Sequence, residues 1–245
     1  NLISESTRRT FLPSSESVLH KNIEEAFENF QPEYVMFDHK KNYNEDDISP
    51  SALKINLDLL ETFWDNHLNT SIPIQYLSGI SYWRNLTLEV SNKVLIPRPE
   101  TELMIEKVLE TLAGSSNKKI LDIGTGSGCI VVSLIKERPK CAATAIDISR
   151  KALNVAKTNA KLHQVENKIN FINIDIDKYK SSNYDLIISN PPYINSIELN
   201  RLDDDIKFHE PILALSGGSD GLRYLKKVIL KSKKLLKVNG KLILE

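Results

Sequence analysis

Residues 119–128 read Lys-Ile-Leu-Asp-Ile-Gly-Thr-Gly-Ser-Gly, and this stretch decides the fold. Its first half, Lys119 to Ile123, is an apolar run with the length of a buried strand. Its glycines let the backbone turn tightly and approach a ligand closely. The segment Cys129 to Arg138 then has the apolar spacing of a helix. A strand, a glycine-rich turn and a helix in succession predict one unit of an α/β fold, with a binding site at the turn.

The same alternation of strand and helix continues to the end of the chain. Further strands are expected at residues 143–146, 169–174, 184–189 and 241–245. A helix capped by Ser149 is predicted up to about His163. Another is predicted from about Gly221 to Leu236, with Asn239-Gly240 in its C-terminal turn. This alternation is typical of a Rossmann-like α/β domain whose sheet is mainly parallel.

The residues before this domain are organised differently. Residues 14–29 and a segment that starts at Pro50 place apolar side chains at helical spacing, with a polar loop at 42–49 between them. They predict a small helical N-terminal domain, residues 1–72, whose apolar face is explained by packing, with a role in substrate recognition left open. Residues 73–97 form a linker, in which 86–90 is expected to pair with 93–96 as a β-hairpin. The α/β domain, 98–245, is expected to begin with a helix over about 101–113.

Composition excludes several classes of protein. The chain has 245 residues with 32 basic and 32 acidic side chains, so it carries no overall positive charge for nucleic acid. Hydrophobic residues make up 41% and charged residues 26%, which is typical of a soluble globular protein. No apolar run approaches the ~20 residues that span a bilayer. Two cysteines and five scattered histidines predict neither a disulfide framework nor a metal site.

The glycine-rich turn, taken with three carboxylates near the strand ends, favours S-adenosylmethionine over a dinucleotide. Its spacing is G-x-G-x-G rather than G-x-G-x-x-G. Asp122 precedes the glycines, where it can meet an ammonium group, directly or through water. Asp147 ends the second strand and can accept from ribose hydroxyls, and Asp175 follows the third strand and can accept from an adenine amino group, with Ile176 against the ring. Taken singly, Asp147 and Asp175 are also explained as helix or turn caps; together the three carboxylates favour the cofactor.

The segment Asn190-Pro191-Pro192-Tyr193 follows an apolar strand and suits a planar NH2 group. Its two prolines fix φ and remove two N–H donors, so the strand ends there. The remaining rigid loop offers a carboxamide, carbonyl oxygens and an aromatic ring, which can accept hydrogen bonds from an NH2 group and stack on its plane. The alternative is a strand that simply ends at prolines.

Three charged residues, Arg98, Glu100 and Glu102, surround the start of the helix expected at residue 101. Acidic side chains are favoured in the first turn of a helix by its dipole, so these residues are explained without a function. A place in the lining of the binding site is the alternative.

Seven segments, taken in order, carry a more specific signal. They are PIQYLSG (73–79), LIPRPETE (95–102), DIGTGSG (122–128), 147–149, SNPPYI (189–194), Glu210-Pro211 and GGSDGL (217–222). In this combination, over about residues 70–245, the chain resembles the HemK/PrmC family. These are protein-(glutamine-N5) methyltransferases that modify peptide-chain release factors.

The resemblance implies a fold and a reaction. The fold is a Rossmann-like S-adenosylmethionine-dependent methyltransferase domain preceded by a small helical domain and a β-hairpin linker. The reaction is transfer of a methyl group from S-adenosyl-L-methionine to the side-chain amide nitrogen of the glutamine in the Gly-Gly-Gln motif of a release factor, which is the expected partner. We expect a monomer that contacts neither membrane nor nucleic acid.

The resemblance also implies which residues bind the cofactor and the substrate and which are catalytic. The expected cofactor-binding residues are Asp122, Gly124, Thr125, Gly126, Ser127, Gly128, Asp147, Ile148, Asp175, Ile176 and Asn190. The expected catalytic residues, which also bind the substrate, are Asn190, Pro191, Pro192 and Tyr193. Further substrate-binding residues are expected at Arg98, Glu100 and Thr101.

Other activities stay open at this point. The NPPY motif also occurs in adenine-N6 DNA methyltransferases, although the neutral charge and the non-basic helical region argue against nucleic acid. The LIPRPETE segment favours release factors over ribosomal-protein glutamine methyltransferases. A non-catalytic, cofactor-binding subunit is a further alternative.

Some features depart from the family pattern or bear on the source of the chain. Trp83 stands where the family usually has Phe. The family's domain continues beyond the final strand with an antiparallel strand pair, so we expect a domain truncated at its C-terminal end. A helical N-terminal domain of this kind implies a bacterial cytoplasmic protein. In a eukaryote, it implies a protein of the mitochondrial matrix or of the matrix of another organelle.

Overall fold

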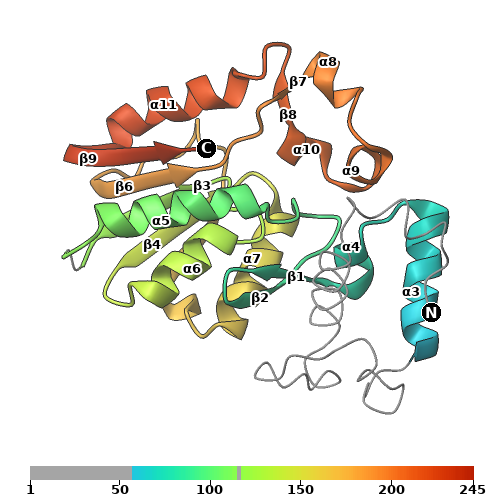
Figure 1. The fold of residues 1–245 in the computed structure, drawn as a ribbon. Helices are drawn as coiled ribbons and strands as arrows, with labels where there is room; N and C mark the ends of the chain where they lie inside the picture. The colour runs from blue at the N-terminus through green and yellow to red at the C-terminus, as the bar shows by residue number, and fades with distance from the viewer. Residues whose placement is uncertain (1–56, 115–116) are drawn as a thin grey trace. The chain divides into compact units, whose positions relative to one another are not determined.

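The computed structural model describes residues 57–114 and 117–245 (Figure 1). The helix expected at 14–29, the loop at 42–49 and the start of the helix at Pro50 lie outside these residues. The chain divides into two units, 1–69 and 70–245. Helix α3, Leu57–Thr70, is the described part of the first unit and confirms the second expected helix from Leu57 onward.

The second unit is built on a five-stranded sheet in which every pair of neighbouring strands is parallel. Its strands are β3 (Lys119–Ile123), β4 (Ala142–Asp147), β5 (Ile169–Asn173), β6 (Tyr184–Ser189) and β9 (Leu236–Leu244). They lie in the order β5-β4-β3-β6-β9. The predicted α/β fold with a mainly parallel sheet is therefore confirmed.

Helices cover both faces of this sheet (Figure 1). On one face, Ile120, Leu186 and Ile188 pack with α5 (Glu102–Thr111) and α6 (Cys129–Glu137). On the other face, Leu121 and Ile187 pack with α11 (Arg223–Leu235). Neighbouring strand residues thus serve opposite cores, because side chains alternate across a strand.

Helix α7, Arg150–Leu162, begins where the sequence predicted. Ser149 is its N-cap, and the Ser149 hydroxyl oxygen accepts a hydrogen bond from the Ala152 N–H at 3.2 Å. The expected turn at Asn239-Gly240 was wrong. Helix α11 already ends at Leu235, and both residues lie inside β9, at the register shift between the Tyr184–Leu236 and Leu186–Lys241 pairs. Asn239 takes a φ of 63° there, which suits a bulge.

The shorter elements complete the described chain. The helices are α4 (Ile74–Ser78), α8 (Ser196–Leu199), α9 (Asp204–His209), α10 (Ile212–Leu215) and the 3-10 turns η2 (Pro99–Thr101) and η3 (Glu166–Lys168). The strands are β1 (Ile80–Trp83), β2 (Leu86–Glu89), β7 (Ile194–Asn195) and β8 (Ser216–Gly218). Strand β7 pairs with β8 in parallel.

The linker hairpin exists, but the predicted partner of its second strand was wrong. Strand β2 pairs antiparallel with β1, and Trp83 lies opposite Leu86. The turn is therefore Arg84-Asn85, with Arg84 at a φ of 53°. Residues 93–96 form no strand, because the Val94 N–H bonds back to the Ser91 carbonyl at 3.0 Å in a tight turn.

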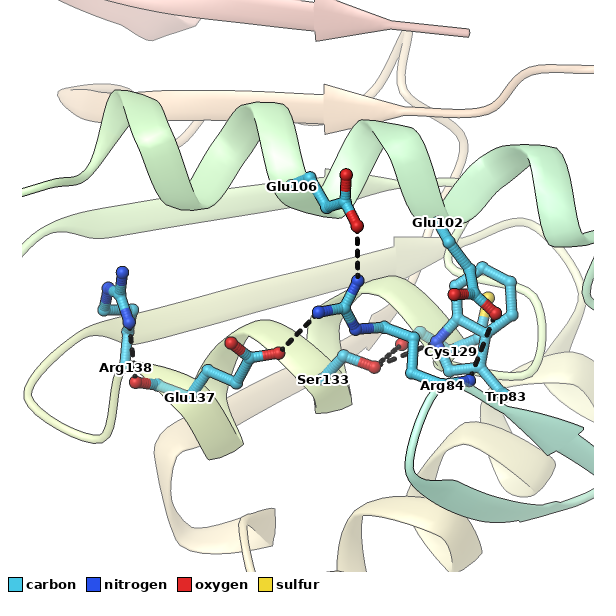
Figure 2. Close-up of polar contacts among 8 residues, drawn as sticks. All are labelled: Trp83, Arg84, Glu102, Glu106, Cys129, Ser133, Glu137 and Arg138. Carbon is cyan, nitrogen blue, oxygen red and sulfur yellow. Dashed lines mark hydrogen bonds and ion pairs between the residues drawn. The ribbon is translucent and has the colours of Figure 1, made fainter.

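The hairpin is anchored to α5 and α6 through its turn (Figure 2). The Trp83 indole N–H donates to the Ser133 hydroxyl at 2.9 Å, and Ser133 in turn donates to the Cys129 carbonyl at 2.7 Å. The Arg84 N–H donates to a Glu102 carboxylate oxygen at 3.2 Å. Phe at position 83 could not make the hydrogen bond to Ser133.

We predict that Trp83→Phe lowers the free energy of unfolding by about 1–3 kcal/mol, because it leaves a gap in a fully buried site and removes the bond to Ser133. Leu230→Ala, at a side chain that is 69% exposed, should change it by less than about 0.5 kcal/mol. Urea denaturation of the whole chain measures both variants. Equal midpoints for Trp83→Phe and the unsubstituted chain would contradict the anchoring.

Candidate active site

A pocket opens at the carboxyl ends of the parallel strands, where β3 is flanked by β4 on one side and β6 on the other. Ligands of open α/β sheets bind at such a switch in strand order. The glycine turn, the end of β4, the residues after β5 and the prolines after β6 all line this pocket. The structure therefore brings together most of the residues singled out from the sequence.

Asp122 lies behind the pocket lining rather than in it. It is fully buried; its Oδ2 accepts a hydrogen bond from the Thr125 hydroxyl at 2.6 Å, and its Oδ1 has no hydrogen-bond partner among the described residues. Burial raises the pKa of Asp122 to about 7, with the Thr125 hydrogen bond opposing the rise and the nearby Asp147 carboxylate adding to it. A buried oxygen without a partner is costly, which points to a cationic or hydrogen-bonding ligand.

Asp147 is held in a fixed orientation at the end of β4. Its Oδ2 accepts from the Gly126 N–H at 3.0 Å, and its Oδ1 accepts from the Ser149 N–H at 2.8 Å. Burial raises its pKa while these backbone N–H groups oppose the rise. A carboxylate oxygen has room for more than one donor, so Asp147 can still accept from a ligand in the pocket.

Asp175 differs from the other two carboxylates because it is paired. Its Oδ1 accepts from Lys227 Nζ of α11 at 2.8 Å and from the Asp177 N–H at 2.8 Å. The hydrogen bond from Lys227 lowers the pKa of Asp175. Lys227 also lines the pocket, and the sequence did not reveal it, since nothing in the helical pattern of α11 distinguishes this lysine from its neighbours.

The glycine turn is fastened to the strand beside it and to helix α7. The N–H groups of Gly124 and Thr125 donate to the Ile146 carbonyl at 2.8 and 3.2 Å. A Cβ at Gly128, which has a φ of 81°, would lie 3.1 Å from the Ala156 side chain. Buried Asn159 donates from Nδ2 to the Ser127 and Glu89 carbonyls, both at 2.9 Å, and so ties the turn to the linker hairpin.

The NPPY loop is held at the tip of β6. The Ser189 hydroxyl donates to the Ile123 carbonyl at 2.7 Å, joining the ends of β6 and β3. Asn190 Nδ2 donates to the Thr101 hydroxyl oxygen at 3.1 Å. Asn190, Pro191 and Pro192 line the pocket, but Tyr193 is 53% exposed and does not. The assignment of Tyr193 to the substrate amide stays a prediction.

A second glycine segment, GGSDGL (217–222), packs directly on the NPPY loop. Gly221 has a φ of 74°, and a Cβ there would lie 2.4 Å from the Tyr193 carbonyl oxygen. A Cβ at Gly217 would likewise lie 2.4 Å from the Gly221 carbonyl oxygen. Side chains at these positions would push the NPPY loop out of place, so close backbone approach explains this motif.

The LIPRPETE segment contributes Arg98 and Thr101 to the pocket, whereas Glu100 is exposed and does not line it. The Arg98 guanidinium forms an ion pair with the buried Glu210 carboxylate. Burial raises the pKa of Glu210, and Arg98 opposes the rise. Substrate binding by Arg98, Glu100 and Thr101 stays a prediction. Pro211, Leu213 and Ala214 also line the pocket; among them, only Pro211 belongs to a segment that the sequence singled out.

Known proteins are similar to this chain over most of its length. The family model described as "Methyltransferase small domain" matches residues 100–203. A protein of Gloeobacter violaceus named release factor glutamine methyltransferase is 34% identical over 197 residues, which are 80% of this chain and 69% of that protein. A protein of the same name from Flavobacterium psychrophilum is 40% identical over 207 residues, 81% of this chain and 71% of that protein.

The chain belongs to the release factor glutamine methyltransferase family. A third relative of that name, from Thermodesulfovibrio yellowstonii, is 39% identical, and the match covers 71% of this chain and 63% of that protein. The chain thus spans about two thirds of the length of these relatives. The expectation of a family of S-adenosylmethionine-dependent methyltransferases is confirmed. Among solved structures, Methanocaldococcus jannaschii Trm5 in complex with adenosine aligns with a TM-score of 0.48 and 20% identity over 66% of this chain and 40% of that one.

The residues of this release factor glutamine methyltransferase fit the cofactor of its family. Asp122 lies behind the pocket lining, and its buried carboxylate can favour the ammonium or the sulfonium of S-adenosylmethionine by its charge or through water. Asp147 and Asp175 add acceptors on the pocket side, while Ile148 and Ile176 add apolar surface.

Among the residues that the structure describes, none of the helices has both the length and the apolar character needed to cross a membrane.

Asp122→Asn should raise the thermal stability of the protein, measured without added cofactor, more at pH 8 than at pH 5. The pKa of this carboxyl is about 7 in the folded chain, well above its ordinary value of 3.8, so its contribution to stability is present below about pH 4 and is lost as pH rises through 7. We expect a difference of roughly 5–10 °C between the two pH values, because about two pH units of linkage at about 1.36 kcal/mol each correspond to about 2–4 °C per kcal/mol. Scanning calorimetry measures it, and the same shift at both pH values would refute a buried, chargeable Asp122.

Gly221→Ala should reduce methyl-transfer turnover at least tenfold, because the added Cβ displaces the Tyr193 carbonyl and with it the NPPY loop. Gly114→Ala is the matched control. Gly114 also has a positive φ, of 67°, but apart from its chain neighbours no atom of the described residues lies within 4 Å of its added Cβ. Steady-state kinetics should show normal turnover for Gly114→Ala, and equal losses in both variants would mean that backbone strain alone is responsible.

Proposed function

We propose that this chain transfers a methyl group from S-adenosylmethionine to the side-chain amide nitrogen of the glutamine in the Gly-Gly-Gln motif of a peptide-chain release factor. One observation carries the proposal: a single pocket is lined both by the glycine turn with its carboxylates and by Asn190, Pro191 and Pro192. A methyl donor and a planar amide can therefore meet in it. The names of the relatives support the release factor as substrate.

The cofactor-binding residues come from three successive strand ends. S-Adenosylmethionine supplies an electrophilic methyl group on sulfur when it is bound. The fixed Asp147 carboxylate accepts from the ribose hydroxyls, and the buried Asp122 carboxylate faces a positive group. Asp175 accepts from the adenine amino group beside Ile176, and its ion pair with Lys227 keeps it ionised. Gly124, Thr125, Gly126, Ser127 and Gly128 form the turn along which the cofactor lies.

The acceptor side must overcome the low nucleophilicity of an amide nitrogen, whose lone pair is delocalised into the carbonyl. Asn190 Oδ1 and the Pro191 carbonyl accept the two amide protons and so aim the nitrogen at the methyl group. Pro192 keeps the loop rigid, and Tyr193 packs on the amide plane. Correct positioning of two reactants is worth ~7–11 kcal/mol of a barrier. We propose no general base, because the nitrogen loses a proton readily once it is methylated.

Outside the pocket, the proposal keeps the layout expected from the sequence. Residues 1–72 recognise the release factor, residues 73–97 link them to the methyltransferase domain, and the protein acts as a monomer. Arg98, Glu100 and Thr101 contribute to substrate binding. The relatives named above are bacterial, which favours a bacterial cytoplasmic or an organelle-matrix location.

We predict that Asn190→Ala loses at least about 100-fold in turnover while cofactor affinity stays within a few fold, because Asn190 acts on the substrate amide. Asp147→Ala should instead lose cofactor binding. Isothermal titration with S-adenosylmethionine and a turnover assay separate the two effects. Normal turnover in Asn190→Ala would contradict the role of Asn190 in holding the substrate amide. Unchanged cofactor affinity in Asp147→Ala would contradict the role of Asp147 in cofactor binding.

Incubation with methyl-labelled cofactor tests the substrate. A release factor with its Gly-Gly-Gln loop, the same factor with that glutamine changed to alanine, a ribosomal protein and duplex DNA are offered in parallel. The proposal requires label in the first factor alone. Label in DNA would favour an adenine-N6 methyltransferase, and no label in any of them would favour a cofactor-binding subunit.

A further inference from the structure

We propose that the Thr101 hydroxyl is a positioning group that holds the Asn190 carboxamide in place at the pocket. The inference rests on the proposed function, in which Asn190 Oδ1 accepts a proton of the substrate amide. Thr101 lies where η2 passes into α5, and its side chain is buried. Its Oγ1 accepts a hydrogen bond from Asn190 Nδ2 at 3.1 Å. Both residues line the pocket.

The two ends of a carboxamide are chemically opposite. The oxygen only accepts hydrogen bonds, and the nitrogen only donates them. When Nδ2 is held by Thr101, Oδ1 is the end that Asn190 can offer to a ligand in the pocket. A half-turn of the group would present Nδ2 to the substrate NH2, so that two donors faced each other. The orientation of Asn190 therefore decides whether the loop can bind an amide nitrogen at all.

Thr101 is itself held firmly enough to fix its neighbour. The Thr101 N–H donates to the Arg98 carbonyl at 3.0 Å, which closes the η2 turn. On one side, Arg98 forms its ion pair with Glu210. On the other, Glu102 accepts from the Arg84 N–H of the hairpin. A β-branched side chain on such a backbone has little rotamer freedom, so its Oγ1 is held in place beside Asn190 Nδ2.

This role is distinct from the substrate contact expected from the sequence. Thr101 acts through Asn190, and the substrate amide does not need to touch it. Loss of the hydroxyl should therefore change the rate at which the bound amide reacts, not the affinity for the cofactor.

Three variants test the inference. Thr101→Val keeps the shape of the side chain and removes the hydroxyl, whereas Thr101→Ser keeps the hydroxyl. Thr144→Val is the control, because the Thr144 hydroxyl also accepts a buried hydrogen bond, from the Tyr184 hydroxyl at 3.2 Å, but Thr144 does not line the pocket. Turnover of the release factor, cofactor affinity by calorimetry and melting temperature are measured for each.

We expect Thr101→Val to lose about 10- to 100-fold in kcat with cofactor affinity within about twofold of the unsubstituted chain. Thr101→Ser should stay within about threefold in kcat. Thr144→Val should lower the melting temperature at least as much as Thr101→Val but leave kcat unchanged. A purely structural threonine would not lower kcat while leaving cofactor affinity unchanged and melting temperature no lower than in Thr144→Val.

Several results would overturn the inference. They are a normal kcat in Thr101→Val, a loss of cofactor affinity as large as the loss of kcat, or a loss in Thr101→Ser as large as in Thr101→Val. Asn190→Ala is assayed alongside. If it turns over normally, the proposed function fails and the inference falls with it. If Asn190→Ala is inactive and Thr101→Val is normal, only the inference fails.

Discussion

The parallel pairing of β6 with β3 is the constraint on which the site depends. The chain adds β4 and β5 on one side of β3 and then returns to place β6 on the other side. Leu121 therefore lies opposite Ile187, although 66 residues separate them, and the two strands end side by side. The Ser189 hydroxyl closes the junction on the Ile123 carbonyl. The glycine turn and the NPPY loop meet in one pocket as a direct result.

The LIPRPETE segment holds the pocket together from outside the sheet. Three of its polar residues are each tied to a different part of the chain: Arg98 to Glu210, Thr101 to Asn190 and Glu102 to the hairpin turn at Arg84. This arrangement gives a physical reason for so many polar residues in one short motif. They position the surrounding segments, whether or not each one also touches the substrate.

The sequence predicted those features that depend on local pattern. The five strands and the helices α5, α6, α7 and α11 follow from apolar periodicity, and Ser149 follows from the chemistry of an N-cap. The partner of β2 was missed because Arg84, a residue without turn preference, adopts the left-handed conformation that closes the hairpin. Residues 93–96, an apolar run that ends at a proline, have the sequence pattern of a strand but follow a tight turn and form no strand.

Features of the site that depend on tertiary contacts could not be predicted. Nothing in the sequence shows that Lys227 reaches Asp175 or that Gly221 lies against the Tyr193 carbonyl. The three carboxylates could be predicted as site residues because each lies at or just after the end of a strand. Their different hydrogen-bond partners could not be predicted. Asp122 is buried with an unpartnered oxygen, Asp147 is held by backbone N–H groups, and Asp175 is ion-paired.

The central claim is that the NPPY loop, at the mouth of a methyl-donor pocket, holds a glutamine side-chain amide. Fragmentation mass spectrometry of the labelled product identifies the atom that received the methyl group. The account predicts one methyl group on the side-chain amide nitrogen of the glutamine in the Gly-Gly-Gln motif. A methyl group on another residue of the release factor, or on an adenine amino group of nucleic acid, would contradict it.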